Sequence, residues 1–127
     1  MGNPRLSFCI VDDDLSFGKS LKRLLNAKGI PAEYFGSAES FLDCIPPGQH
    51  GYALVDLHMP DCDGLALLGQ MKQMQYAMPV IIITGQAQIE ARDLALRMGA
   101  VGFLQKPFTG ESLMEVVAKY EANGCSG

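Results

Sequence analysis

Residues 53–64, ALVDLHMPDCDG, join an apolar run to a loop that is rich in turn-forming residues. The run has the character of a buried strand, and it ends in one carboxylate, Asp56, just before the Pro60 to Gly64 loop. Open α/β folds place their chemistry at the carboxyl edge of the sheet. The pattern therefore predicts a functional carboxylate at that edge.

Three other apolar runs also end in polar side chains. They are residues 6–11 before Asp12, Asp13 and Asp14, residues 80–83 before Thr84, and residues 101–105 before Lys106. We expect these strand ends to meet at one edge of a parallel sheet. Together the acids, the hydroxyl and the lysine would form a small pocket for a divalent cation and a phosphoryl group.

The composition fits a single globular domain. The chain has 127 residues, 48% of them hydrophobic, and a formal net charge of −4. This length can bury a core of its own, and the negative charge argues against direct nucleic-acid binding by this domain. No apolar run approaches the roughly 20 residues of a membrane span, and the start lacks a signal-peptide core. The four cysteines are Cys9, Cys44, Cys62 and Cys125. They have no metal-binding spacing, which favours a reducing cytoplasm.

Strand-like runs alternate with helix-like stretches along the chain. We expect strands over residues 6–11, 32–35, 52–56, 80–84 and 101–105, and helices over 15–28, 38–44, 65–74, 89–98 and 110–120. Five β/α units require a parallel sheet with right-handed crossovers. Residues 80–83 are apolar throughout, as in a sheet covered on both faces, whereas 32–35 are mixed and fit an edge strand. The predicted fold is a doubly wound, five-stranded parallel α/β sheet of the flavodoxin-like type.

The acids at the sheet edge suit metal-assisted phosphoryl chemistry. With the ordinary pKa of a carboxyl group, Asp56 is ionised at neutral pH and can attack phosphorus, although the repulsion between anions opposes the attack. Mg²⁺ would offset that repulsion, and Asp12 and Asp13 are its expected further ligands. Thr84 can donate a hydrogen bond to a phosphoryl oxygen, and Lys106 can supply a positive charge to another.

Each candidate also has a purely structural interpretation. Acids before a helix act as N-caps, and Asp61 and Asp63 are typical turn formers. His58 fits a solvated loop residue, because Mg²⁺ does not select imidazole, and Phe103 fits a core residue. A functional site is favoured because all the candidates fall at strand ends and have complementary charge.

The sequence resembles the receiver domain of bacterial two-component response regulators from residue 6 to about residue 120. The motifs that carry the resemblance are IVDD at 10–13, DLHMPDCDG at 56–64, ITG at 83–85 and GAVGFLQKPF at 99–108. Residues 83–86 and 99–108 most resemble receivers that precede a helix-turn-helix output domain. We therefore expect residues 1–127 to form one receiver domain with its core at about 6–120.

The resemblance implies a role for each acid of the predicted site. It makes Asp56 the phosphoacceptor, and Asp12 and Asp13 the acidic pair that serves Mg²⁺. His58, two residues beyond the acceptor, would offer only its backbone carbonyl to the metal.

The resemblance also implies a set of switch residues. Thr84 would be the switch hydroxyl and Lys106 the phosphate-sensing lysine, with a cis bond to Pro107. Phe103 takes the aromatic switch position, where it lacks the hydroxyl of the tyrosine that is common there.

The implied function is a phosphorylation-controlled signalling switch. A partner histidine kinase would supply the phosphoryl group, and residues 89–120 would contact an output domain or a second copy of the chain. Such a domain catalyses only its own phosphorylation and dephosphorylation. Two alternatives stay open: an aspartyl-nucleophile phosphatase, which usually has an acid where this chain has His58, and a receiver-like interaction module that is never phosphorylated. The sequence leaves the cognate kinase, the output and the stand-alone or excised nature of the chain undecided.

Overall fold

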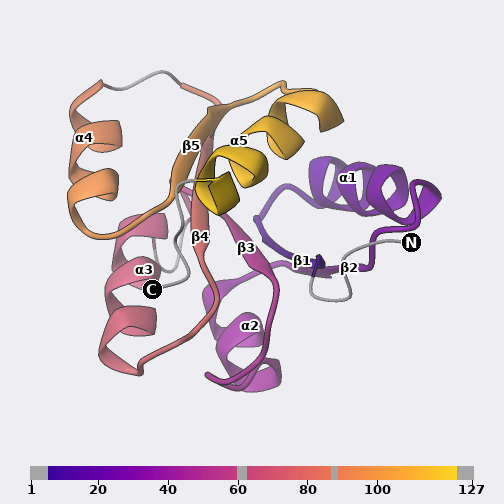
Figure 1. Ribbon diagram of the computed structural model, residues 1–127. Helices are drawn as coiled ribbons and strands as arrows, with labels where there is room; N and C mark the ends of the chain where they lie inside the picture. The colour runs from indigo at the N-terminus through magenta and orange to yellow at the C-terminus, as the bar shows by residue number, and fades with distance from the viewer. Residues whose placement is uncertain (1–5, 60–62, 87–88, 123–127) are drawn as a thin grey trace.

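The computed structural model describes residues 6–59, 63–86 and 89–122, and strands and helices alternate throughout them. The elements are β1 (Phe8–Val11), α1 (Leu15–Ala27), β2 (Ala32–Phe35), α2 (Ala38–Cys44), β3 (Tyr52–Asp56), α3 (Gly64–Gln73), β4 (Val80–Thr84), α4 (Ile89–Arg97), β5 (Gly102–Gln105) and α5 (Gly110–Ala122). All neighbouring strands pair in parallel, in the order β2-β1-β3-β4-β5. This order confirms the predicted doubly wound fold, with β2 at an edge (Figure 1).

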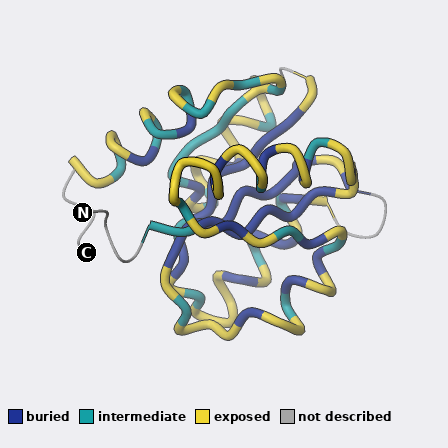
Figure 2. The backbone as a smooth tube through the Cα atoms, turned by 90° about the vertical axis from the view of Figure 1, so that its right-hand side faces the viewer, coloured by how far each residue is buried: buried dark blue, intermediate teal, exposed yellow. Residues whose placement is uncertain are grey.

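Helices cover both faces of the sheet and create two cores. Helices α1 and α5 contribute to one core, and α2, α3 and α4 contribute to the other. The strands alternate between them with a period of two: in β4, Ile81 and Ile83 face the α1/α5 side, whereas Val80 and Ile82 face the opposite side. Figure 2 shows the result, with buried residues along the central strands and exposed residues on the outer helix surfaces.

Side-chain caps define where four helices begin. In each, an oxygen accepts a hydrogen bond from the N–H three residues further on: Asp14 from Phe17, Ser37 from Ser40, Asp63 from Ala66 and Thr109 from Ser112. The cap of α1 lies three residues after the end of β1, so the loop that carries Asp12 and Asp13 is short. Asp63, interpreted from the sequence as a turn former, caps α3.

Most element bounds agree with the prediction, and those that differ do so by one or two residues. Helix α3 begins at Gly64 because Asp63 caps it, and α5 continues to Ala122. On α1, Leu24 lies off the buried face and is 40% exposed. The buried stripe instead runs through Gly18, Leu21 and Leu25, whose spacing of three and four residues keeps them on one face. The Asn123-Gly124 pair in the sequence predicts the end of the last helix, and both residues lie outside the described ranges.

Candidate functional site

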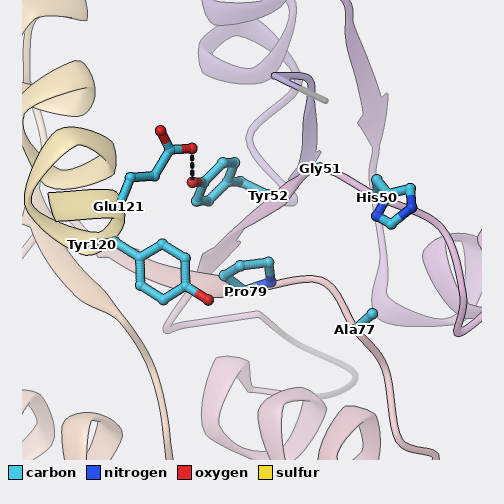
Figure 3. A pocket seen from close by; sticks show the side chains of 7 residues that line it. All are labelled: His50, Gly51, Tyr52, Ala77, Pro79, Tyr120 and Glu121. Carbon is cyan, nitrogen blue, oxygen red and sulfur yellow. Dashed lines mark hydrogen bonds between the residues drawn. The ribbon is translucent and has the colours of Figure 1, made fainter. Parts of the chain in front are cut away.

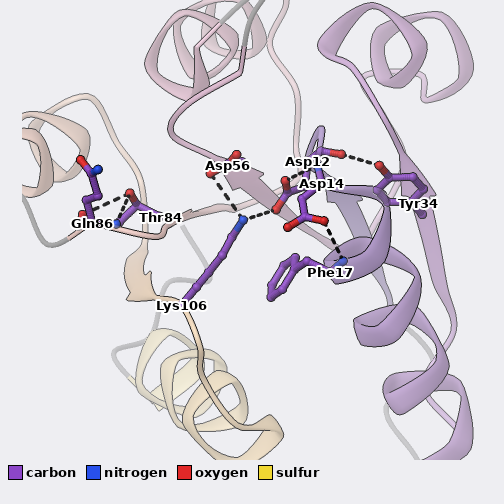
Figure 4. A network of polar contacts seen from close by, with 8 residues as sticks. All are labelled: Asp12, Asp14, Phe17, Tyr34, Asp56, Thr84, Gln86 and Lys106. Atoms are coloured by element: carbon purple, nitrogen blue, oxygen red, sulfur yellow. Dashed lines mark hydrogen bonds and ion pairs between the residues drawn. The ribbon is translucent and has the colours of Figure 1, made fainter.

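The described part of the chain buries three charged or polar side chains: Asp12, Asp56 and Thr84. Asp12 directly follows β1, while Asp56 and Thr84 are the last residues of β3 and β4. These strands are neighbours in the sheet, so the three side chains meet at its carboxyl edge (Figure 4). Because an otherwise apolar core accepts polar groups only at a cost, their clustering marks this edge as the candidate site.

Three carboxylates converge at this edge. One oxygen each from Asp12, Asp13 and Asp56 lies within 4.8 Å of the others, and Asp13 is the exposed member. Oxygen donors of this kind are what Mg²⁺ and Ca²⁺ select. The donor set therefore fits a hard divalent cation, as the sequence predicted.

Lys106 supplies the positive charge of the site. Its Nζ lies 2.6 Å from Oδ2 of Asp12 and 3.9 Å from Oδ1 of Asp56. The other oxygen of Asp12 accepts a hydrogen bond of 2.9 Å from the backbone N–H of Asp14. Lys106 thus rests on Asp12 while remaining close to Asp56, and its bond to Pro107 is cis, as the resemblance implied.

The environment of Asp56 favours its neutral form. Burial and the charge of Asp12 raise its pKa from 3.8 to about 7, although Lys106 and the backbone N–H of His58 act in the opposite direction. The protein's own groups therefore leave this carboxyl only partly ionised near neutral pH. The sequence-based expectation used the ordinary pKa of a solvated carboxyl, which includes neither burial nor the charge of Asp12.

An aromatic pair supports the lysine. The Nζ of Lys106 lies 4.3 Å from the centroid of the Phe17 ring, within cation–π range. Phe17 in turn meets Phe108 edge to face, with centroids 5.7 Å apart. Sequence reasoning missed Phe17, whose only local signal is an aromatic side chain three residues after the α1 cap.

Thr84 makes its hydrogen bonds within its own loop. Its hydroxyl donates to the carbonyl of Gln86 at 3.1 Å and accepts from the N–H of Gln86 at 3.2 Å (Figure 4). Its backbone carbonyl accepts a 2.7 Å hydrogen bond from the N–H of Lys106. The structure therefore brings Thr84 to the same edge as the acids, with its hydroxyl bound to the loop after β4.

The remaining predicted residues surround this centre. His58 is exposed, while Phe103 is half-buried in β5, pairs with Ile82 and packs against the core of α2, α3 and α4. Cys9 is buried, and burial followed by the charge of Glu33 raises the pKa of its thiol to about 12. Asp61 lies outside the described residues, as do the neighbouring Pro60 and Cys62.

Two residues near Asp12 were not singled out from the sequence. The hydroxyl of Tyr34 donates a 2.6 Å hydrogen bond to the backbone carbonyl of Asp12. Burial, and then the charges of Asp12, Asp13 and Asp14, raise the pKa of this phenol. Gly18 lies against the Tyr34 ring, and a glycine inside a helix is the signal that could have indicated such a close approach.

A separate pocket lies at the opposite edge of the sheet. It has a volume of about 410 Å³, and its lining includes His50, Tyr52 at the start of β3, and Glu121 near the end of α5. The hydroxyl of Tyr52 donates to Oε2 of Glu121 at 2.7 Å (Figure 3). This pocket contains none of the acids described above, so it does not contribute to their chemistry.

The parallel α/β fold with acids and a lysine at its carboxyl edge defines a class of domain that can bind a cation beside a buried carboxyl group. Residues 8–118 match the response regulator receiver domain family, and the chain belongs to that family. Receiver domains of this kind are phosphorylation-controlled signalling switches that work with histidine kinases and output domains. The resemblance noted in the sequence is thereby confirmed.

Known relatives agree with this assignment. The chain is 36% identical over 108 residues to the transcriptional regulatory protein FixJ of Bradyrhizobium diazoefficiens, covering 85% of this chain and 53% of FixJ. It is 38% identical over 108 residues to the DNA-binding transcriptional regulator NtrC of Klebsiella pneumoniae, covering 85% of this chain and 23% of NtrC. The chain thus spans about half the length of FixJ and about a quarter of NtrC.

Solved structures of similar proteins have the same fold. The crystal structure of FixJ-N superposes with a TM-score of 0.82 at 33% identity, and 93% of each chain is covered. The response regulator StyR gives a TM-score of 0.81 at 33% identity, covering 89% of this chain and 57% of StyR. In the described ranges, every helix is too short or too polar to cross a membrane.

Proposed function

We propose that Asp56 is the phosphoacceptor of this signalling switch, and that a phosphohistidine of a partner histidine kinase is the donor. One observation carries the proposal: Asp56 is a nearly buried carboxyl at a strand end, beside two further acids and within 3.9 Å of Lys106. In the proposed step, a carboxylate oxygen of Asp56 attacks phosphorus and forms a P–O bond. The P–N bond breaks, and the imidazole of the donor leaves with the electron pair.

The acidic cluster would hold Mg²⁺ during this step. Asp12, Asp13 and Asp56 would supply the carboxylate oxygens, and His58 would offer its backbone carbonyl. A bound Mg²⁺ supplies positive charge that offsets the repulsion between the acceptor and the phosphoryl oxygens. Burial of Asp12 and Asp56 keeps water from competing for their oxygens, which strengthens electrostatic interactions at the site.

Lys106 and Thr84 would then detect the phosphoryl group. Lys106 Nζ lies between Asp12 and Asp56, so a short movement of its side chain reaches a phosphoryl oxygen on Asp56. Thr84 would exchange its hydrogen bond to Gln86 for one to another phosphoryl oxygen. That exchange moves the loop after β4, and Phe103 on the adjacent strand would adjust its burial.

We further propose that the surface of residues 89–120 passes this change to an output domain or a second copy of the chain. Helix α4 carries three exposed apolar side chains, which suits a protein contact: Ile89 at 73%, Leu94 at 45% and Leu96 at 41% exposure. In this proposal, residues from 6 to about 120 act as one phosphoacceptor domain. It catalyses only its own phosphorylation and dephosphorylation.

Incubation with acetyl phosphate and Mg²⁺, followed by intact mass spectrometry, tests the proposal. We expect one phosphoryl group per chain, lost on treatment with hydroxylamine, and none on Asp56→Asn, whose amide is a poor nucleophile. Asp14→Asn is a matched control, because an exposed capping acid is replaced by a residue that also caps helices. Multiple turnover on small phosphomonoesters would instead indicate a phosphatase, and an unlabelled wild type would indicate an interaction module.

A further inference from the structure

The backbone of Asp12 is tied to β2 beyond the end of strand pairing. The register of β1 and β2 ends with Val11 opposite Phe35. One residue further on, the N–H of Asp12 donates to the carbonyl of Phe35 at 3.0 Å. The carbonyl of Asp12 accepts a 2.6 Å hydrogen bond from the hydroxyl of Tyr34. The Tyr34 side chain thus takes the place of a backbone donor after the sheet has ended (Figure 4).

The packing of α1 makes room for this contact. A Cβ atom built on Gly18 would lie 2.1 Å from Cε1 of Tyr34, which is far inside van der Waals contact. Glycine destabilises a helix interior, so its position in α1 has a packing reason: the Tyr34 ring lies where any other side chain would begin. Gly18 and Tyr34 together allow the phenol to reach the carbonyl of Asp12.

This contact controls the orientation of one peptide group, the one that joins Asp12 to Asp13. A change of the Asp12 ψ angle, which turns this group, would move the Cα of Asp13 and would change the direction in which its exposed side chain leaves the backbone. Asp12 has a second restraint, because its carboxylate is bound by Lys106 and by the N–H of Asp14. Tyr34 is therefore positioned to orient Asp12 and Asp13 through the backbone, without itself being a ligand of the cation.

We propose that Tyr34 is a positioning residue for the cation site, whose hydroxyl holds the Asp12–Asp13 peptide in the orientation that divalent-cation binding requires. The inference rests on the proposed function of Asp12 and Asp13 as cation ligands. Groups that orient metal ligands typically change metal affinity by about 10- to 100-fold. Because Tyr34 acts through a backbone carbonyl, we expect a smaller change of about three- to tenfold.

The test is a calorimetric titration of the chain with Mg²⁺, comparing wild type with Tyr34→Phe. This change keeps the ring over Gly18 and removes only the hydroxyl. Tyr76→Phe is a matched control, because the hydroxyl of Tyr76 also donates to a backbone carbonyl, that of Ile45, at the same distance of 2.6 Å. Tyr76 packs against the core on the other face of the sheet.

We expect the Kd for Mg²⁺ to rise about three- to tenfold in Tyr34→Phe and to stay within about twofold of wild type in Tyr76→Phe. Both variants should lose a similar amount of thermal stability in EDTA, since each loses one hydrogen bond of the same type. A Kd of Tyr34→Phe within twofold of wild type, or an equal rise in both variants, would overturn the inference. A wild type that does not bind Mg²⁺ would instead refute the proposed cation site.

Two further readouts separate positioning from general destabilisation. Phosphorylation of Tyr34→Phe by acetyl phosphate should be slow at low Mg²⁺ and should recover the wild-type rate at saturating Mg²⁺. Gly18→Ala should displace the Tyr34 ring and also raise the Kd, and the double variant with Tyr34→Phe should bind Mg²⁺ no more weakly than the weaker single variant. Two results would contradict a positioning role. One is a rise in Kd in the double variant equal to the product of the two single-variant rises, and the other is a phosphorylation rate of Tyr34→Phe that stays low at saturating Mg²⁺.

Discussion

Replacement of Asp56 by asparagine should stabilise the protein in the absence of divalent cations. Asp56 is 6% exposed and lies beside the fully buried Asp12. Burial and the charge of Asp12 raise its pKa from 3.8 to about 7, and Lys106 offsets only part of this shift. Ionised Asp56 therefore destabilises the folded state, and asparagine removes the ionisation while keeping almost the same shape.

The sign and size of the effect follow from proton linkage. The folded protein binds the Asp56 proton more tightly than the unfolded chain does. The contribution of Asp56 to the free energy of unfolding is therefore fully present below its pKa in the unfolded chain, and it is lost as pH rises through its pKa in the folded protein. A shift from 3.8 to about 7, at about 1.4 kcal/mol per pKa unit, sets a ceiling of about 4 kcal/mol. We expect about half of that ceiling, about 2 kcal/mol, because the amide also remains desolvated.

Urea unfolding in EDTA between about pH 4.5 and pH 8 measures this effect. The stability advantage of Asp56→Asn over wild type should grow up to about pH 7 and stay level above it. Asp14→Asn serves as the control, because Asp14 is exposed and caps α1. An advantage that does not change with pH, or one that shrinks as pH rises, would refute the assignment of a raised pKa to Asp56.

Three further substitutions probe the partners of Asp56. Asp13→Ala should weaken Mg²⁺ binding about tenfold or more and raise the melting temperature in EDTA by relieving repulsion among the acids. Equal stabilisation of the variant and the wild type by Mg²⁺ would show that Asp13 is not a ligand. Lys106→Ala should lose about 2 kcal/mol in EDTA, because Asp12 is left buried without its counter-charge. The same variant should accept phosphate more slowly, and beryllofluoride should cause smaller amide shifts over residues 89–120 than in wild type; shifts of wild-type size would contradict its role. Phe17→Leu should cost about 1 kcal/mol in urea unfolding through the lost cation–π contact, and an unchanged midpoint would show that this contact is weak.

The sequence was sufficient for the fold because its strongest signals are local. Strand β4 was predicted with its observed bounds, since residues 80–83 are apolar without interruption and Pro79 and Gly85 flank the strand. The polar ends of the strands were also visible, and parallel pairing brings them to one edge. The predicted acids therefore lie together in the structure.

The contacts between distant residues could not be predicted in the same way. Tyr34 lies 22 residues from Asp12 in the sequence, and only the register of β1 and β2 brings its hydroxyl to that carbonyl. The contact of Lys106 with Asp12 depends on the charges of buried groups that lie far apart in the sequence. Burial and the same charges determine the raised pKa of Asp56, which the reference value of a solvated carboxyl does not reveal.

The most direct test of the central proposal is to locate the phosphoryl group in the chain. Wild-type protein is treated with acetyl phosphate and Mg²⁺, reduced with borohydride, which converts an aspartyl phosphate to homoserine, and analysed by peptide mass spectrometry. Modification at Asp56 alone, dependent on Mg²⁺ and absent from an unphosphorylated control, is the predicted result. Homoserine at Asp12, Asp13 or any other aspartate with Asp56 unmodified would contradict the account.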